Sequence, residues 1–420
     1  MSNSHVVTDL VAKEALRVAH EKSQFLSTID RQYDESFTYQ ARGGQHGQTL
    51  RVRSPNQYTR RQGSRVMAVQ DQQEASQTIT VATQDGVDMR FNSQELIQSV
   101  HSEGAFDELS RNYIQPAISM LISGIESDAI AYMSKATYNV AGTAGTALTD
   151  LVAVGSARAK LNQGLAPKDG NRVIQCDSVT MGGMVNGLKG LFQDSSQIKE
   201  QYREGMIGRT SMADWYENDR MWSMTNGSDV TGTTDSAALV TDGGSVIDIH
   251  TTVAVTLQVV GQVFTVAGVY RCHPETKAVL PGAPLQQFVI TAINAATTTV
   301  SPSIYLGLSA TTAAKQNVCK SDGTKLALTD FNSATLTFVG AASTSYVQNL
   351  MYHKEAYQFI TADLPILDDA QKCVRVNKDG ISLRCWLGSD IRNDELLMRV
   401  DILYGLAALR SEWGCRIVGS

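Results

Sequence analysis

Residues 107–136 read DELSRNYIQPAISMLISGIESDAIAYMSKA, and the rest of the chain can be organised around this stretch. Apolar residues recur at steps of three and four, which places them on one stripe of a helix: Ile114, Ile118, Leu121, Ile125, Ala129, Tyr132 and Met133. Polar residues fall mostly off this stripe and predict a solvated opposite face: Ser119, Ser123, Glu126, Ser127 and Ser134. Pro116 belongs either in the first turn or at a kink after a shorter helix from Asp107, and both alternatives are open here.

The totals describe an ordinary globular chain with more than one domain. Its 420 residues exceed what one hydrophobic core usually serves. A net charge of −6 argues against a protein that coats nucleic acid in bulk. No apolar run approaches the roughly eighteen residues of a membrane span, and the first residues lack the pattern of a secretory signal. We therefore expect no membrane partner.

Motifs for catalysis or for binding a cofactor are not found in the sequence. The six cysteines have no CxxC spacing and are typical of free thiols in a reducing cytoplasm. The seven histidines form no HxxxH or HxH pair, so metal ligation is unsupported. Residues 182–189 come near a phosphate-binding loop, but Leu188 stands where the lysine is needed. We expect no cofactor, no metal and no enzyme, and favour a structural or binding protein.

The N-terminal region predicts one amphipathic helix over residues 8–26. Its apolar residues alternate with charged residues of both signs: Leu10, Val11, Ala15, Val18, Ala19 and Leu26. Such a helix could be an arm lying on a neighbouring molecule or a helix docked on its own domain. The pattern does not decide between these two.

Residues 36–70 are strongly basic, with six arginines (42, 51, 53, 60, 61 and 65) and no acidic residue. LRVRSP (50–55) predicts a half-exposed strand, and VMAVQD (66–71) and TITVAT (78–83) are candidate return strands of a long hairpin. Arginines can bind phosphates, which makes nucleic-acid binding one interpretation. Aromatic residues are few, and the chain as a whole is negative, so we favour an acidic patch on another protein chain.

The middle of the chain predicts an α/β layer interrupted by a β-rich domain. Helices are expected over 150–163 and 179–192, with a buried strand over 171–176. Residues 226–345 are poor in charge and predict a small barrel or sandwich inserted into a loop. Its candidate strands are VAVTLQV (253–259), VFTVAGVY (263–270), QQFVIT (286–291), TTVSPS (298–303) and TLTFVG (335–340).

After residue 349 the sequence again predicts a mixture of secondary structures, and its last part is an apolar run. VRVNKDGISLRCWL (374–387) predicts a hairpin that turns at residues 378–380. MRVDILYGLAALRSEWGCRI (398–417) predicts a strand buried on both faces.

Four stretches carry a resemblance to a known family: FDELSRNYIQPAISMLISGIESDAI (106–130), GQVFTVAGVYRCHPETK (261–277), NLMYHKEAY (349–357) and DILYGLAALRSEWGCRI (401–417). They resemble the major capsid (coat) proteins of tailed bacteriophages with the HK97-type fold, in the P22-like branch. The second and fourth stretches are the most specific. The chain departs from the branch at Ser411, where proline is usual, and at His273, where asparagine is commoner.

The resemblance implies an α+β HK97-like capsid fold with an inserted small β-barrel I-domain. Its parts would be the following: an N-terminal arm (1–36), an extended E-loop hairpin (37–82), a peripheral domain with the spine helix (83–147), an axial domain in two parts (148–225 and 346–392), the inserted barrel (226–345) and closing strands (393–420).

The function implied is that of a shell protein. Many copies would assemble with a scaffolding protein and a portal protein into the icosahedral procapsid and head of a tailed phage. Packaged double-stranded DNA would meet the inner face non-specifically. The protein would be found in the virion after assembly in the host bacterial cytoplasm. A nucleic-acid-binding protein that uses the arginines of 42–65 is the alternative, and a hydrolase with a β accessory domain is a second rival.

The resemblance also suggests contact residues. The candidates for contacts between subunits are Arg51, Arg53, Arg60, Arg61 and Arg65 in the hairpin, and Asp229, Asp235 and Asp242 in a loop of the inserted domain. Asp9 and Glu14 are candidates for contact with a basic scaffolding segment.

Overall fold

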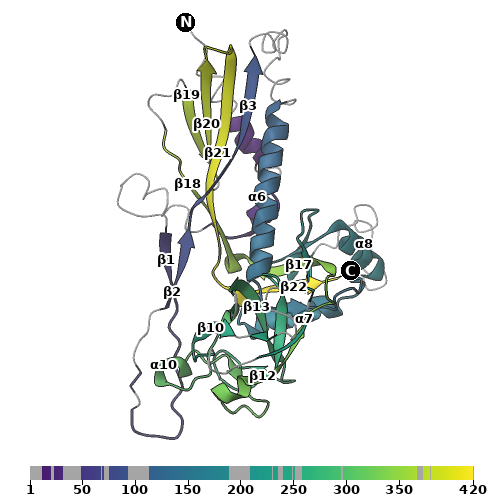
Figure 1. Ribbon diagram of the computed structural model, residues 1–420, viewed down its shortest axis with the longest axis vertical. Coiled ribbons are helices and arrows are strands. Elements are labelled where there is room, and N and C mark those ends of the chain that lie inside the picture. Colours follow the sequence, from purple (N-terminus) through teal and green to yellow (C-terminus); the bar gives the residue numbers. More distant parts are fainter. Residues whose placement is uncertain are drawn as a thin grey trace. The chain divides into compact units, whose positions relative to one another are not determined.

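A computed structural model describes residues 12–19, 23–31, 49–67, 69–70, 75–92, 113–188, 209–228, 230–234, 240–247, 249–250, 258–294, 297–366, 372–378 and 380–419. The chain divides into two compact units (Figure 1). The first unit comprises Met1–Val52, Gln77–Ala129 and Tyr357–Ala407, and the second comprises Arg53–Ser76, Ile130–Ala356 and Ala408–Ser420. No helix among these described ranges is long and apolar enough to cross a membrane.

The predicted spine helix is α6, Gln115–Ala136. Pro116 is its second residue, where a missing N–H costs nothing, and Tyr113 and Ile114 just before it form a π-helical turn. Residues 107–112, where a preceding helix would lie, are outside the described part. The apolar stripe is buried as expected at Ile114, Ile118, Leu121, Ile125, Ala129 and Met133, but Tyr132 is 44% exposed.

The polar face of α6 is not uniformly solvated, which corrects the prediction for Glu126 and Ser134. Both residues are fully buried. The Glu126 carboxylate accepts hydrogen bonds from the backbone N–H groups of Gln24, at 2.9 Å, and Phe25. Phe25 begins the short helix α2, Phe25–Thr28. Backbone N–H groups at a helix start lack partners within the helix, and a carboxylate is a favourable acceptor for them.

The N-terminal helix is docked on its own unit. Residues 12–19 are helical, and the apolar side chains of this helix are at most 4% exposed: Ala12, Ala15, Leu16, Val18 and Ala19. Of the two alternatives for this segment, the structure therefore shows the docked helix. Residues 8–11 and 20–22 lie outside the described part.

The sheet of the first unit is built on one long strand, β21, Glu395–Ala408. It pairs antiparallel with β3, Thr83–Asn92, and with β20, Ile381–Asp390. β19, Lys372–Lys378, pairs with β20 as the predicted hairpin, with Lys378 opposite Ile381. β18, Tyr357–Ala362, lies next to β21 in the strand order. The N-terminal end of α6 lies beside β3, where the rings of Tyr113 and Phe91 are 5.7 Å apart (Figure 1).

Asp401 is a buried charged residue in the middle of this sheet, and it has a register partner on the strand at each side. Arg384 of β20, Asp401 of β21 and Gly86 of β3 are register partners in one line. Asp401 is fully buried, and its carboxylate accepts from Arg384 Nη2 and from Arg399 Nε, both at 2.7 Å. A Cβ on residue 86 would lie 2.5 Å from Asp401 Oδ1 and 2.8 Å from the Val400 carbonyl oxygen. Glycine thus leaves the space that the carboxylate occupies.

We predict that Gly86→Ala lowers the free energy of unfolding by about 1–3 kcal/mol, because the added methyl group must displace backbone or the buried carboxylate. Urea unfolding followed by circular dichroism measures this. Gly388→Ala is the matched control, since Gly388 also lies in a strand and its Cβ would meet nothing within 4 Å. Equal stability of the two variants would contradict the role given to Gly86.

The second unit contains a mixed sheet in the order β4-β22-β17-β5-β7-β6, with β8 also paired to β17. The strands are β4 Val140–Ala141, β5 Arg172–Cys176, β6 Arg209–Thr210, β7 Ala213–Glu217, β8 Ser223–Thr225, β17 Ser345–His353 and β22 Gly414–Val418. The predicted helices appear as α7, Val152–Gln163, and α8, Ser178–Leu188. β5 and β22 are buried along their whole length, including Arg172, Gln175 and Arg416. The single closing strand predicted over 398–417 is wrong: β21 ends at Ala408, a 3-10 turn follows at Ser411–Trp413, and β22 begins at Gly414.

Residues 231–338 of this unit form a separate eight-stranded sheet in the order β10-β14-β13-β12-β16-β9-β11, with β15 beside β12. Its strands are β9 Thr231–Thr234, β10 Gly244–Ile247, β11 Ile249–His250, β12 Val263–Arg271, β13 Leu285–Asn294, β14 Thr297–Ile304, β15 Val318–Cys319 and β16 Thr335–Phe338. Four of the predicted strands are thereby confirmed, at β12, β13, β14 and β16. The fifth, VAVTLQV, is not: 251–257 are outside the described part, and 258–259 are not in a strand.

This sheet has its own apolar core, which includes Phe264, Phe288, Phe331 and Phe338. Rings of Phe264 and Phe338 lie 5.4 Å apart and those of Phe264 and Phe288 5.9 Å apart. A second cluster joins the sheet to the mixed sheet and contains Tyr138, Val140, Val263, Val289, Tyr346 and Val418. The inserted strands thus pack on themselves and also on the sheet that carries them.

A polar mount holds the inserted strands at the edge of the mixed sheet. Gln287 of β13 accepts from Val140 N–H at 2.9 Å and donates to the Val140 carbonyl at 3.2 Å, as a neighbouring strand would. Lys160 of α7 donates to Gln287 Oε1 at 2.7 Å and to the same carbonyl. Burial lowers the pKa of Lys160. The end strand β4 therefore has both polar groups of Val140 occupied by side chains.

We predict that Gln287→Met destabilises the protein by about 1–3 kcal/mol, because it leaves the largely buried Val140 N–H and the Lys160 amine without this acceptor. Differential scanning calorimetry measures the loss. Thr337→Val on the exposed side of β16 is the control and should change little. A variant as stable as the control would show that water replaces Gln287 without cost.

Candidate functional site

The basic segment forms an extended arm between two short paired strands, β1 Thr49–Ser54 and β2 Ala75–Thr80. Beyond them the two limbs are held by one side chain. Thr59 N–H donates to Gln70 Oε1 at 2.9 Å, and Gln70 Nε2 donates to the Thr59 carbonyl at 2.7 Å. This pair of hydrogen bonds, the arm clamp, closes a loop over residues 59–70, the arm loop (Figure 1).

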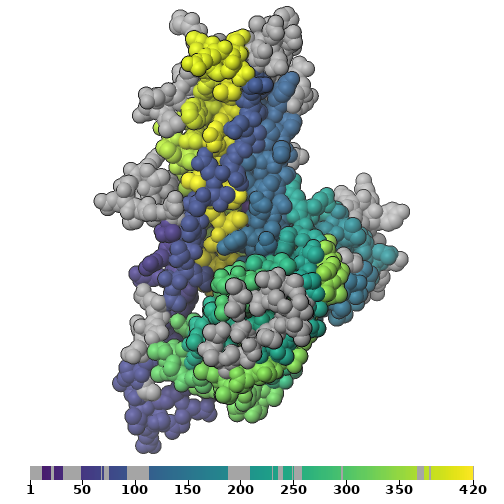
Figure 2. Space-filling view, in the orientation of Figure 1, coloured from purple at the N-terminus to yellow at the C-terminus, as the bar shows by residue number. Residues whose placement is uncertain are grey.

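Charged and apolar side chains are both exposed on the arm. The five predicted arginines are exposed: Arg51, Arg53, Arg60, Arg61 and Arg65. Four apolar side chains are also exposed, namely Tyr58 at 57%, Val66 at 76%, Met67 at 77% and Val69 at 78%. Figure 2 draws this segment in dark blue at the lower left. The arm thus offers charge and apolar surface together.

The predicted return strand VMAVQD is wrong. Residues 66, 67, 69 and 70 lie in no strand, and β2 begins only at Ala75. Val66, Met67 and Val69 therefore have no strand ladder to join. Four exposed apolar residues of the arm were not predicted as candidate site residues from the sequence: Tyr58, Val66, Met67 and Val69. The available signal was an apolar run inside a segment without acidic residues.

Of the three acidic contact candidates in the inserted domain, only Asp242 is among the described residues. Its carboxylate accepts from the backbone N–H groups of Leu306 at 2.7 Å, Gly307 at 3.2 Å and Leu308 at 2.8 Å, and from the Thr312 hydroxyl at 2.5 Å. Burial acts to raise the pKa of Asp242, but these hydrogen bonds outweigh it and lower the pKa. Asp242 is thus engaged within its own chain. Asp229 and Asp235 lie outside the described residues.

Of the two scaffolding-contact candidates, Glu14 is described and Asp9 is not. Glu14 accepts from Arg17 at 2.7 and 2.9 Å and from Gln115 Nε2 at 2.9 Å. The hydrogen bonds from Arg17 are the main cause of its lowered pKa. A scaffolding partner would have to compete with these internal donors.

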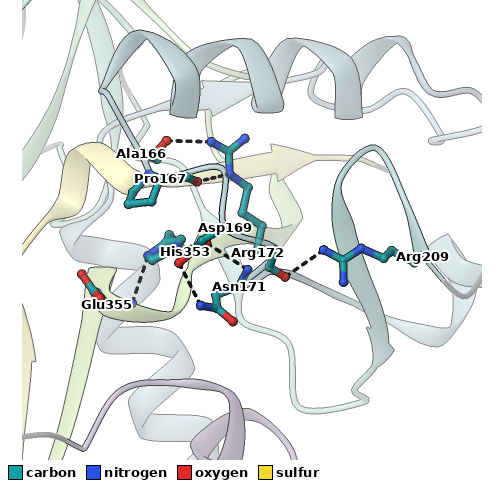
Figure 3. Close-up of polar contacts among 9 residues, drawn as sticks. Ala166, Pro167, Asp169, Asn171, Arg172, Arg209, His353 and Glu355 are labelled. Atoms are coloured by element: carbon teal, nitrogen blue, oxygen red, sulfur yellow. Dashed lines mark hydrogen bonds and ion pairs between the residues drawn. The ribbon is translucent and has the colours of Figure 1, made fainter.

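A polar cluster lies where β17 ends and β5 begins (Figure 3). His353 is buried and contacts Asp169 Oδ1 through Nε2 at 3.0 Å, while its Nδ1 accepts from Glu355 N–H at 3.3 Å. The proton therefore sits on Nε2. Arg172 donates to the carbonyls of Pro167 at 3.0 Å and Ala166 at 2.8 Å. These contacts fix the loop between α7 and β5, a structural role.

The charge of Asp169 stabilises this cluster. Burial acts to raise its pKa, but hydrogen bonds from Asn171 and His353 outweigh it and lower the pKa from 3.8 to about 2. Because the pKa is lowered by folding, the stabilisation is present above pH 3.8 and is lost as the pH falls toward about 2. Among the described residues, no group of three or more His, Cys, Asp or Glu side chains could hold a metal ion.

We predict that Asp169→Asn is less stable than the natural chain at neutral pH and that the difference shrinks between pH 3.8 and about 2. Urea unfolding at a series of pH values measures both. Glu275→Gln, at an exposed position, is the control and should keep the acid dependence of the natural chain. An unchanged pH profile in Asp169→Asn would contradict the assignment.

Comparison of the sequence with known protein families identifies one family that matches most of the chain. Residues 78–419 match the family described as "P22 coat protein - gene protein 5". No curated protein matches the chain.

Among solved structures, similar chains include those of several phages. A chain of Mycobacterium phage Che8 is 10% identical, with 94% of this chain and 90% of that chain covered and a TM-score of 0.49. The capsid of Staphylococcus phage Andhra is 9% identical, covers 94% and 84%, and has a TM-score of 0.40. The capsid of Myoviridae phage XM1 is 10% identical, covers 94% and 91%, and has a TM-score of 0.40. At these scores the family assignment rests on the sequence match alone, which spans well over half of the chain: the protein belongs to the P22 coat protein family, whose members are structural proteins and not enzymes.

Proposed function

We propose that copies of this chain assemble, with a scaffolding protein and a portal protein, into the icosahedral procapsid and head of a tailed double-stranded DNA phage. The observation that carries the proposal is the coat-protein family match over residues 78–419. The exposed arm supports it, because a shell subunit needs extended elements that reach its neighbours. Assembly would take place in the host bacterial cytoplasm, and the packaged genome would lie inside.

We propose the domain layout of the P22-like branch for the same reason. The sheet of residues 231–338, with its own apolar core, would be the inserted domain, a small barrel placed within the axial domain. The polar mount at Gln287 would hold it at a fixed angle within its own subunit. Residues 37–82 would be the extended loop over a neighbouring subunit.

The arginines would make the charged part of that contact. Arg51, Arg53, Arg60, Arg61 and Arg65 are exposed and would pair with acidic residues of the neighbour. Each exposed ion pair contributes only about 0–1 kcal/mol, but the contact would recur at every subunit of the shell. Asp229, Asp235, Asp242, Asp9 and Glu14 remain weaker candidates, since two are already engaged internally and three are not described.

The alternative of a nucleic-acid-binding protein keeps one observation in its favour, the exposed arginines of the arm. It predicts strong affinity of the unassembled chain for duplex DNA, falling steeply with salt. A shell protein of net charge −6 that meets packaged DNA non-specifically predicts weak affinity. Fluorescence anisotropy with a labelled duplex at several salt concentrations separates the two.

We predict closed shells, tubes or partial shells when the purified chain is concentrated alone or co-expressed with its scaffolding protein. Sedimentation velocity and negative-stain electron microscopy detect them. Replacing Arg60, Arg61 and Arg65 with glutamate together should suppress assembly without changing thermal unfolding, because exposed side chains contribute little to folding. A chain that stays monomeric or dimeric under all these conditions would refute the coat function.

A further inference from the structure

The exposed apolar side chains of the arm have no role in the folded subunit described so far. We propose that Tyr58, Val66, Met67 and Val69, the apolar patch, anchor the arm on a second copy of this chain, while the arginines orient the approach. The inference rests on the proposed function, because it names the chemistry that holds one shell subunit to the next.

The arm clamp joins the two limbs that carry the apolar patch. Thr59 and Gln70 are joined by the two hydrogen bonds of the arm clamp. Tyr58 precedes Thr59 and Val69 precedes Gln70, so both apolar residues adjoin the clamp, one on each limb. Val66 and Met67 lie between Thr59 and Gln70, inside the loop that the clamp closes. A loop tied at its base presents these side chains with less ordering cost than an open chain would.

The degree of exposure is unusual for apolar residues so close in sequence. Val66, Met67 and Val69 fall within four positions and are 76%, 77% and 78% exposed. Single exposed apolar residues are normal on a protein surface, but a group of them marks an interaction site. Methionine adapts its shape to a partner surface, and aromatic residues and methionine are enriched in the buried centre of interfaces.

Charge indicates that the occupant is a copy of the same chain. Residues 49–80, from β1 through β2, contain five arginines, Asp71 and Glu74 and therefore carry +3; the whole chain carries −6, so the remaining residues carry −9. The arm of one copy and the body of another are therefore electrostatically complementary. Charge complementarity raises the association rate, whereas buried apolar contacts mainly slow dissociation.

The two kinds of side chain should differ in their response to salt. Exposed ion pairs weaken as salt screens them, while apolar burial does not. Burying one large apolar side chain also stabilises more than one exposed ion pair does. The apolar patch should therefore set the affinity at high salt, and the arginines should matter mostly at low salt.

Two matched triple variants test this. One changes Val66→Thr, Met67→Gln and Val69→Thr, and the other changes Arg60→Gln, Arg61→Gln and Arg65→Gln. The readout is the lowest protein concentration that forms shells, followed by light scattering at about 0.05 M and about 0.5 M NaCl. We expect the apolar variant to need at least about tenfold more protein at both salts, a loss of about 1.4 kcal/mol per subunit. The arginine variant should need more protein only at low salt.

Oxidation of Met67 provides a second readout without mutation. One hydrogen peroxide converts the thioether to a sulfoxide and leaves one water. In the free chain, Met67 and Met120 are exposed to nearly the same degree, 77% and 75%, so both should oxidise at similar rates. In shells, oxidation of Met67 should slow at least about tenfold relative to the free chain, as measured by peptide mass spectrometry.

The possible outcomes distinguish the two proposals. If the natural chain forms no shells, the coat function fails. If it forms shells but the apolar variant assembles like the natural chain, or Met67 in shells oxidises at the free-chain rate, the anchor role fails and the coat function stands. Thermal unfolding of both variants should match that of the natural chain, since the side chains are exposed.

Discussion

The row of Arg384, Asp401 and Gly86 is the constraint on which the first unit depends. Asp401 is fully buried at the centre of β21, and its carboxylate is met by the buried Arg384 and by the half-exposed Arg399. Removing one partner of such a pair leaves a buried charge without compensation, which is strongly destabilising. The register of β3 and β20 against β21 is tied to this one position, because a shift of one residue would take both the glycine and Arg384 away from the carboxylate.

In the second unit, a sheet with its own core is attached to the mixed sheet. An apolar cluster provides the contact area between the two sheets, and the hydrogen bonds of Gln287 and Lys160 fix their relative position. The side-chain amide of Gln287 satisfies both polar groups of Val140, so the end strand gains a partner without a further strand. Apolar packing alone tolerates sliding, whereas these hydrogen bonds hold only in one position.

The regular elements could be predicted from sequence, and the departures have physical causes. Periodicity identified α6, α7, β5 and the hairpin of β19 and β20, because apolar spacing reflects local geometry. It failed at Glu126, whose burial depends on the N–H groups of Gln24 and Phe25, about a hundred residues away. In the arm, composition identified the arginines as candidates. It could not identify Val66 and Met67, because apolar residues are normally read as buried and their exposure is visible only in the folded chain.

The arm clamp has a consequence for how such a protein can change over generations. Two hydrogen bonds from one glutamine side chain to the Thr59 backbone set the width of the arm loop, and no strand ladder runs through the described residues between them. The described side chains between the clamped positions are exposed, so substitutions there should change what the loop contacts more than how the body folds. The arm loop is in this sense an exchangeable part of the subunit.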